Sequence, residues 1–115
     1  QILGNGLQSK SYIHVEDIVD ALRTVERHNA GGYEYYNVAT LDHLTVREIA
    51  QMSVEVMNLS HVAYHYTGGD RGWKGDVPIV RLDSKKLRAL GWENKYTSKE
   101  AMRRSLGAMR EEIMS

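Results

Sequence analysis

Apolar residues recur at helical spacing in four parts of the chain, which predicts four helices. The first begins near Glu16 and ends at the glycine pair 31–32. Two more open with capping boxes at residues 45–48 and 97–100, each with Thr first and Glu fourth. A short helix follows Asp83 and is closed by Gly91. The expected buried faces are Ile18, Val19, Leu22 and Val25; Val46, Ile49, Ala50, Val54 and Met57; and Met102, Leu106, Met109 and Ile113.

Short runs of β-branched and aromatic residues predict strands at 10–15, 35–39 and 61–66. The opening residues, Gln1 to Leu3, read as the end of a further strand that runs into a glycine turn. Because such a strand needs a neighbour, we expect the chain to be a fragment or truncation of a longer protein. The order of elements predicts an α/β fold, a small mixed domain of short strands and about four helices. One domain is expected over residues 1–115.

Charge and composition narrow the function classes. The chain has 15 basic and 15 acidic residues and a formal net charge of zero, which argues against a nucleic-acid-binding protein. No apolar run approaches the length of a membrane span, so no membrane partner is expected. The absence of cysteine excludes disulfides and cysteine metal sites. We expect a cytoplasmic protein.

The glycine-rich segment 69–75 has the spacing G-x-x-G-x-x-G, which is reminiscent of a dinucleotide-binding loop. Such a loop must lead directly into a helix whose free N–H groups hold the pyrophosphate. No helical pattern resumes before Asp83, so we reject that interpretation. Arg71, Trp73 and Lys74 give the segment positive charge and an aromatic face that suit a phosphate group. The alternative is a solvated loop with Trp73 packed against the core, and the residues alone leave both open.

Other candidate chemistry is weaker. His61 and His65 share one side of a predicted strand, about 13 Å apart, too far for one zinc ion. The sequence has no cysteine and no G-x-S-x-G nucleophile elbow. The acidic residues Glu16, Asp17 and Asp20 are expected to form a solvated helix start. Composition and spacing therefore indicate no catalytic machinery and no metal site.

Three stretches in order resemble one enzyme family: GNGLQSKSYIHVED at 4–17, YNVA at 36–39, and GDVP at 75–78 with the later Gly-Trp pair at 91–92. They are similar to the carboxy-terminal, substrate-binding part of the NAD-dependent sugar-nucleotide epimerase/dehydratase family, the extended short-chain dehydrogenases. Within that family the pattern is closest to the UDP-glucose 4-epimerases. The resemblance covers about residues 4 to 106.

The resemblance implies a site for a nucleotide-diphosphate sugar. Gln8 matches a substrate-facing glutamine of the family, and Lys10 stands where the family has an arginine that contacts the diphosphate. A lysine there replaces a two-pronged guanidinium with a point charge. The second diphosphate arginine of the family falls at Trp73 here, so the role passes to Arg71, or alternatively to Lys74.

The family's catalytic Tyr-x-x-x-Lys pair and its NAD-binding loop lie in an amino-terminal Rossmann domain. None of the seven tyrosines here has a lysine four residues later. The resemblance thus implies that this chain binds no cofactor, that NAD belongs to the parent enzyme, and that the chain alone is inactive. The alternative is a non-enzymatic binding or interaction module derived from the same lobe. Lacking its Rossmann partner, the chain is expected to form a homodimer through the strand edge at Ile2 and Leu3 or through the last helix.

Overall fold

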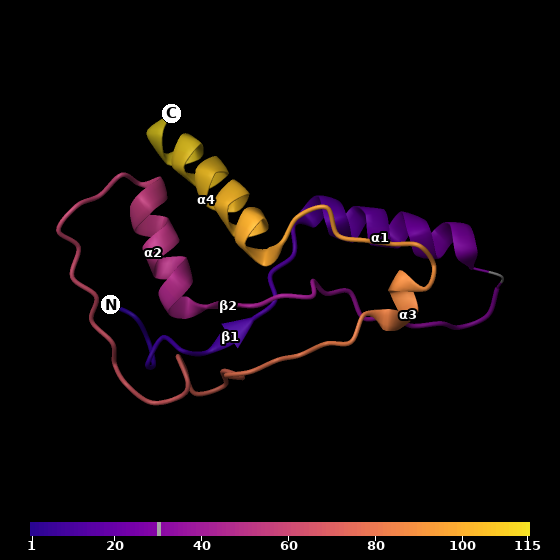
Figure 1. Ribbon diagram of the computed structural model, residues 1–115, viewed down its shortest axis with the longest axis horizontal. Coiled ribbons are helices and arrows are strands. Elements are labelled where there is room, and N and C mark those ends of the chain that lie inside the picture. Colours follow the sequence, from indigo (N-terminus) through magenta and orange to yellow (C-terminus); the bar gives the residue numbers. More distant parts are fainter. Residues whose placement is uncertain (30) are drawn as a thin grey trace.

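The computed structural model describes residues 1–29 and 31–115 and contains, within them, four helices and one two-stranded sheet (Figure 1). Number and order of the helices agree with the sequence prediction. The elements are β1 (Ser9–Lys10), α1 (Val15–His28), β2 (Leu44–Thr45), α2 (Val46–Val56), α3 (Lys85–Arg88) and α4 (Ser98–Met114). None of these helices is long and apolar enough to cross a membrane.

The helix starts are set by local hydrogen bonds that the sequence already indicated. In α2 the hydroxyl of Thr45 accepts from the N–H of Glu48, and in α4 Thr97 does the same for Glu100, each at 3.2 Å. In both helices the glutamate side chain also accepts from the backbone N–H of the capping threonine. Both predicted capping boxes are therefore confirmed.

The two remaining helices differ slightly from their predicted limits. Helix α1 starts at Val15, where the ring Nδ1 of His14 accepts from the N–H of Glu16 at 3.1 Å. Helix α3 ends at Arg88, before the expected stop at Gly91, and Asp83 accepts from the N–H of Lys85 at 2.9 Å. Asp83 therefore satisfies an N–H at the start of the helix, as a cap would, although the helix begins one residue later than expected.

The strand predictions were wrong in extent. Segment 10–15 contributes only its first residue to the antiparallel pair of β1 and β2, in which Ser9 lies opposite Thr45. Segment 61–66 forms a single parallel bridge, between Tyr66 and Ile2, and segment 35–39 forms no strand. These segments do not form longer strands because a strand is stable only when a neighbouring strand takes up its backbone hydrogen bonds. Periodicity in the sequence does not say whether that neighbour is present.

The amino-terminal edge, expected to be unpaired, is paired on one side within the chain. The N–H of Ile2 donates to the carbonyl of His65 at 2.6 Å, and the N–H of Thr67 donates back to Ile2 at 3.0 Å. The homodimer expected from this edge stays a prediction.

A small core holds α1 against the α3 region. Ala21, Leu87 and Trp92 are at most 2% exposed and form its centre. The indole N–H of Trp92 donates to the backbone carbonyl of Asp17 at 3.0 Å, which fixes the ring beneath the helix. Partly buried side chains pack around this centre, namely Ile13, Val25, Tyr36 and Val38.

Asp17 corrects the prediction of a solvated acidic helix start. Its side chain is fully buried and accepts from the N–H groups of Lys95 at 2.8 Å and Tyr96 at 3.2 Å. These bonds attach the loop before α4 to the first turn of α1. A buried carboxylate is tolerated because backbone donors replace the water that it loses.

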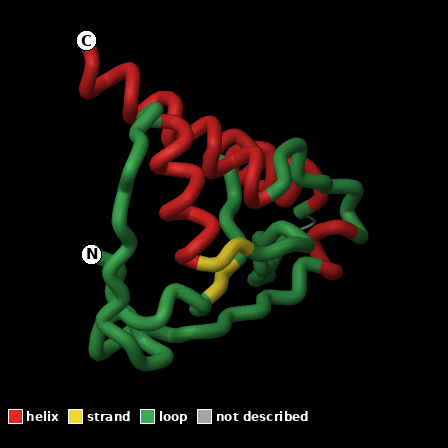
Figure 2. Tube along the Cα trace, turned by 60° about the vertical axis from the view of Figure 1, so that its left-hand side comes forward, coloured by secondary structure: helices red, strands yellow, loops and turns green. Residues whose placement is uncertain are grey.

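The molecule is open and elongated. Its radius of gyration is 16.9 Å, against about 13 Å for a compact domain of this length. Helices α2 and α4 pack side by side (Figure 2). A long loop leaves the end of α2 and runs along the side of the molecule away from α1 until it reaches α3 (Figure 2). The expected faces are incompletely covered, since Leu22 of α1 and Ile113 of α4 are 66% and 71% exposed.

Candidate functional site

Two loops far apart in the sequence lie along one another. Residues 2–9 bond to residues 65–78 through a ladder of backbone hydrogen bonds. The N–H of Gly68 donates to Gly4 at 2.9 Å, and the N–H of Asn5 donates to Gly69 at 2.8 Å. Further along, the N–H of Ser9 donates to Pro78 at 2.9 Å. The ladder therefore unites the two segments in which the sequence placed Gln8, Lys10, Arg71 and Lys74.

Glycine is required where these loops meet. Gly4 has a φ of +82°, and a Cβ atom there would lie 2.9 Å from the carbonyl oxygen of Arg71. Gly6 has a φ of +77°, and its Cβ would lie 2.6 Å from Cγ of Arg47. The Arg47 guanidinium covers the ring of Tyr66, at 4.4 Å from the ring centre, and donates to the carbonyl of Asn5 at 2.9 Å. Close packing thus fixes the path of the first loop.

Lys10 makes an ion pair across the two loops. Its ammonium group lies 3.1 Å from Oδ1 of Asp76, whose side chain is only 6% exposed. The other oxygen of Asp76 accepts from the N–H of Gly72 at 3.0 Å. The pKa of Asp76 is lowered, first by the Gly72 bond and then by Lys10. Sequence reasoning missed Asp76 as a site residue, although the Gly-Asp pair of the 75–78 motif contained the signal.

Gln8 is buried between the same loops. It is 6% exposed, and its amide nitrogen donates to the carbonyl of Leu3 at 3.0 Å. Its side-chain oxygen is buried and accepts from no described residue. A buried acceptor of this kind needs a donor from water or from a ligand.

Arg71, Trp73 and Lys74 project from the second loop. All three are exposed, and Trp73 is 65% exposed. The interpretation in which Trp73 packs against the core is therefore wrong, and Trp92 fills the core instead. No ion pair joins Arg71 or Lys74 to another residue in the described ranges. Their charges are available to an anion.

The segment after Gly75 does not start a helix. Between residues 70 and 84 the chain is irregular, and the next helix is α3, which begins at Lys85. The glycine loop therefore lacks the helix N-terminus on which a dinucleotide pyrophosphate would rest. Within residues 1–29 and 31–115 no three His, Asp or Glu side chains gather as a metal site would require.

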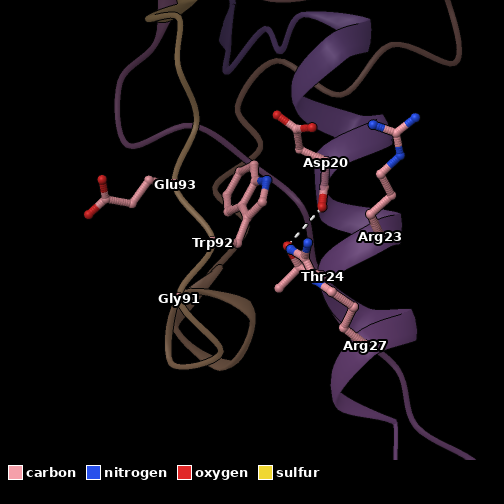
Figure 3. A pocket seen from close by; sticks show the side chains of 7 residues that line it. All are labelled: Asp20, Arg23, Thr24, Arg27, Gly91, Trp92 and Glu93. Carbon is pink, nitrogen blue, oxygen red and sulfur yellow. Dashed lines mark hydrogen bonds between the residues drawn. The ribbon is translucent and has the colours of Figure 1, made fainter.

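Apart from the two loops, the structure has a hollow between α1 and residues 91–93 (Figure 3). It has a volume of about 260 Å³, and Arg23 and Arg27 line it from α1. Trp92 lies opposite them, and the Thr24 hydroxyl donates along the helix to the carbonyl of Asp20 at 2.8 Å (Figure 3). Asp20 and Glu93 also line the hollow, so it contains negative as well as positive side chains. The hollow thus combines opposite charges without a set of donors that converge on one ligand.

Comparisons with known proteins show that the chain is similar to part of several nucleotide-sugar enzymes. No protein-family model matches it. GDP-L-fucose synthase 1 of Arabidopsis thaliana is 29% identical over 106 residues, covering 88% of this chain and 30% of that protein. The dTDP-D-glucose 4,6-dehydratase of Bos taurus is 28% identical over 114 residues, covering 96% of this chain and 32% of its relative.

Solved structures agree. UDP-glucose 4-epimerase of Thermotoga maritima, crystallised with UDP-glucose, superimposes with a TM-score of 0.79 at 26% identity. The superposition covers 97% of this chain and 35% of the epimerase chain. MoeE5 in complex with UDP-glucuronic acid and NAD gives a TM-score of 0.79 at 25% identity, over 96% of this chain and 36% of its own.

The proteins that this chain matches are nucleotide-sugar synthases, epimerases and dehydratases. The chain is similar to the carboxy-terminal part of these extended short-chain dehydrogenases, so the resemblance inferred from the motifs is confirmed. It spans about a third of the length of the relatives that it matches.

Proposed function

We propose that this chain is the nucleotide-sugar-binding lobe of an NAD-dependent epimerase or dehydratase. The observation that carries the proposal is the ladder between the two loops, because it holds the two candidate phosphate-binding segments side by side. Lys10, Arg71 and Lys74 supply the positive charge of the proposed site. Buried Gln8 supplies a side-chain oxygen without a partner among the described residues.

In this proposal Arg71 binds the diphosphate directly, because its guanidinium is exposed and is not engaged by an acidic residue of the described ranges. Lys10 has two tasks. It adds positive charge near the phosphates, and through Asp76 it fixes the turn that carries Arg71. Lys74 is the alternative to Arg71 on the same exposed loop.

The described residues do not fit NAD. The glycine segment 69–75 leads into an irregular segment, and no tyrosine of the sequence has lysine four residues later. A tyrosine acts as a base near neutral pH only when neighbouring positive charge lowers its pKa. The proposed division of labour is that this lobe holds the nucleotide sugar, while NAD and the proton-transferring residues belong to the part of the relatives that this chain does not span.

Calorimetric titration of the chain with UDP-glucose, dTDP-glucose and GDP-fucose tests the proposal. We expect binding of at least one of these, weakened about ten-fold or more by Arg71→Ala. The matched control is Arg110→Ala, which removes an exposed arginine from α4, away from both loops. Equal affinities of the two variants would contradict the role of Arg71, and no binding of any of the three nucleotide sugars would contradict the proposed function.

A further inference from the structure

Trp73 is an exposed aromatic ring beside the charges of the candidate site. It is 65% exposed and stands between Arg71 and Lys74 in the sequence, two basic residues without an ion-pair partner in the described ranges. The family resemblance places an arginine at position 73, so it assigns no role to a tryptophan there. An aromatic side chain contributes most when its large surface is buried in a core or against a ligand. The surface of Trp73 is therefore available to a ligand.

The turn that carries Trp73 is held by three bonds. The N–H of Asp76 donates to the carbonyl of Trp73 at 2.9 Å, and Oδ2 of Asp76 accepts from the N–H of Gly72 at 3.0 Å. The ammonium of Lys10 reaches Oδ1 of Asp76 from the first loop, at 3.1 Å. These bonds give the turn a fixed position relative to Lys10.

Gly75 seats one edge of the Trp73 indole. A Cβ atom at residue 75 would lie 2.7 Å from Cη2 and 3.2 Å from Cε3 of Trp73, and closer still to Cζ3. The six-membered part of the indole therefore rests against the backbone of Gly75, and any side chain at this position would force the ring to move. The ring is thus held in place along one edge while most of its surface stays open.

The other tyrosine or tryptophan ring of the two loops is already covered. The guanidinium of Arg47 lies 4.4 Å from the ring centre of Tyr66. Within residues 1–29 and 31–115, by contrast, Trp73 takes part in no ring–ring contact and in no cation–ring contact. Of these two rings, that of Trp73 is the one on which a planar group of a ligand can stack.

We propose that the ring of Trp73 stacks on the nucleobase of the nucleotide sugar, while Arg71 and Lys10 hold the diphosphate. The inference rests on the proposed function. A nucleotide sugar joins a planar base to a negatively charged diphosphate, which matches an open aromatic ring beside unpaired positive charge. Every base has a π-face, so stacking adds affinity without selecting one base over another. At position 73 a contact to the base thus takes the place of the phosphate contact that the resemblance implies for an arginine.

Tryptophan fluorescence tests the stacking, because the two tryptophans of the chain lie in opposite surroundings. Trp92 is 2% exposed, so the neutral quencher acrylamide acts mainly on the emission of Trp73. We expect saturation with UDP-glucose or GDP-fucose to reduce this quenching by at least about half, because a stacked base covers the ring. A bound nucleotide sugar that leaves the quenching unchanged would overturn the inference.

Two variants separate an aromatic contact from a change of shape. Trp73→Leu removes the ring, and we expect it to weaken nucleotide-sugar binding at least about five-fold in calorimetric titrations. Trp73→Phe keeps an aromatic face and should retain most of the affinity. The matched control is Tyr33→Leu, which removes an aromatic side chain that is 88% exposed and outside both loops, and which should leave the affinity unchanged.

The outcomes distinguish this inference from the proposed function. Wild-type affinity in Trp73→Leu, or equal losses in Trp73→Leu and Trp73→Phe, would overturn the stacking and leave the nucleotide-sugar site standing. No binding of any nucleotide sugar to the wild-type chain would overturn the proposed function, and the stacking with it. Because Trp73 is 65% exposed, both variants should melt like the wild type, which circular dichroism checks.

Discussion

Replacing Asp17 tests how firmly α1 is attached to the loop before α4. The side chain is fully buried and accepts from the N–H groups of Lys95 and Tyr96, at 2.8 and 3.2 Å. Asp17→Ala removes both acceptors and leaves two partly buried donors without a partner. The loss of one hydrogen bond to a charged group lowers the free energy of unfolding by about 1.5–3 kcal/mol. Because water that reaches the loop replaces part of the lost bonding, we expect Asp17→Ala to lower the free energy of unfolding by about 2–4 kcal/mol in total.

That loss is large for a domain of this size. For 115 residues it corresponds to a fall of about 8–16 °C in Tm, measurable by circular dichroism or calorimetry. Asp17→Asn keeps one acceptor oxygen, so we expect it to lose about half as much. The control is Glu26→Ala, an exposed acidic residue of the same helix, which should leave Tm within about 2 °C. A Tm for Asp17→Ala equal to that of the control would refute the structural role of the buried carboxylate.

Three further outcomes are expected. Leu87→Ala empties the centre of the core, where Leu87 is fully buried, and should lower the free energy of unfolding by about 2–5 kcal/mol in denaturant titrations. Burial raises the pKa of Asp42, but hydrogen bonds from Ser98 outweigh it and leave the pKa below its ordinary 3.8. This bond stabilises the fold above pH 3.8 and is lost as the pH falls below it, so Asp42→Asn should flatten the decline in stability seen in acid. Asp76→Asn should weaken nucleotide-sugar binding if Lys10 acts by holding the turn, whereas unchanged affinity in calorimetry would assign Lys10 to direct phosphate contact alone.

The sequence predicted those features that depend on neighbouring residues. The capping boxes at Thr45 and Thr97 were located correctly because each involves residues three positions apart. The strands were overestimated because segment 35–39, for example, has the composition of a strand but no strand neighbour in the described structure. The burial of Asp17 was missed because it depends on backbone donors almost 80 residues away.

In the candidate site, too, the sequence indicated the local motifs but not the contacts between distant residues. Motifs placed Gln8 and Lys10 in one loop and Arg71 in another, and only the structure brings these loops together. The pairing of Lys10 with Asp76 joins residues 66 positions apart, so no local pattern contains it.

A nuclear magnetic resonance titration of the chain with UDP tests the central claim most directly, because it maps binding residue by residue. If the two loops form one nucleotide-diphosphate site, the backbone amide shifts should change at residues 4–10 and 69–76 together. The side-chain amide of Gln8 should shift with them. Changes around Arg23 and Arg27, in the hollow of Figure 3, would place the ligand elsewhere and contradict the claim, as would an unchanged spectrum at millimolar UDP.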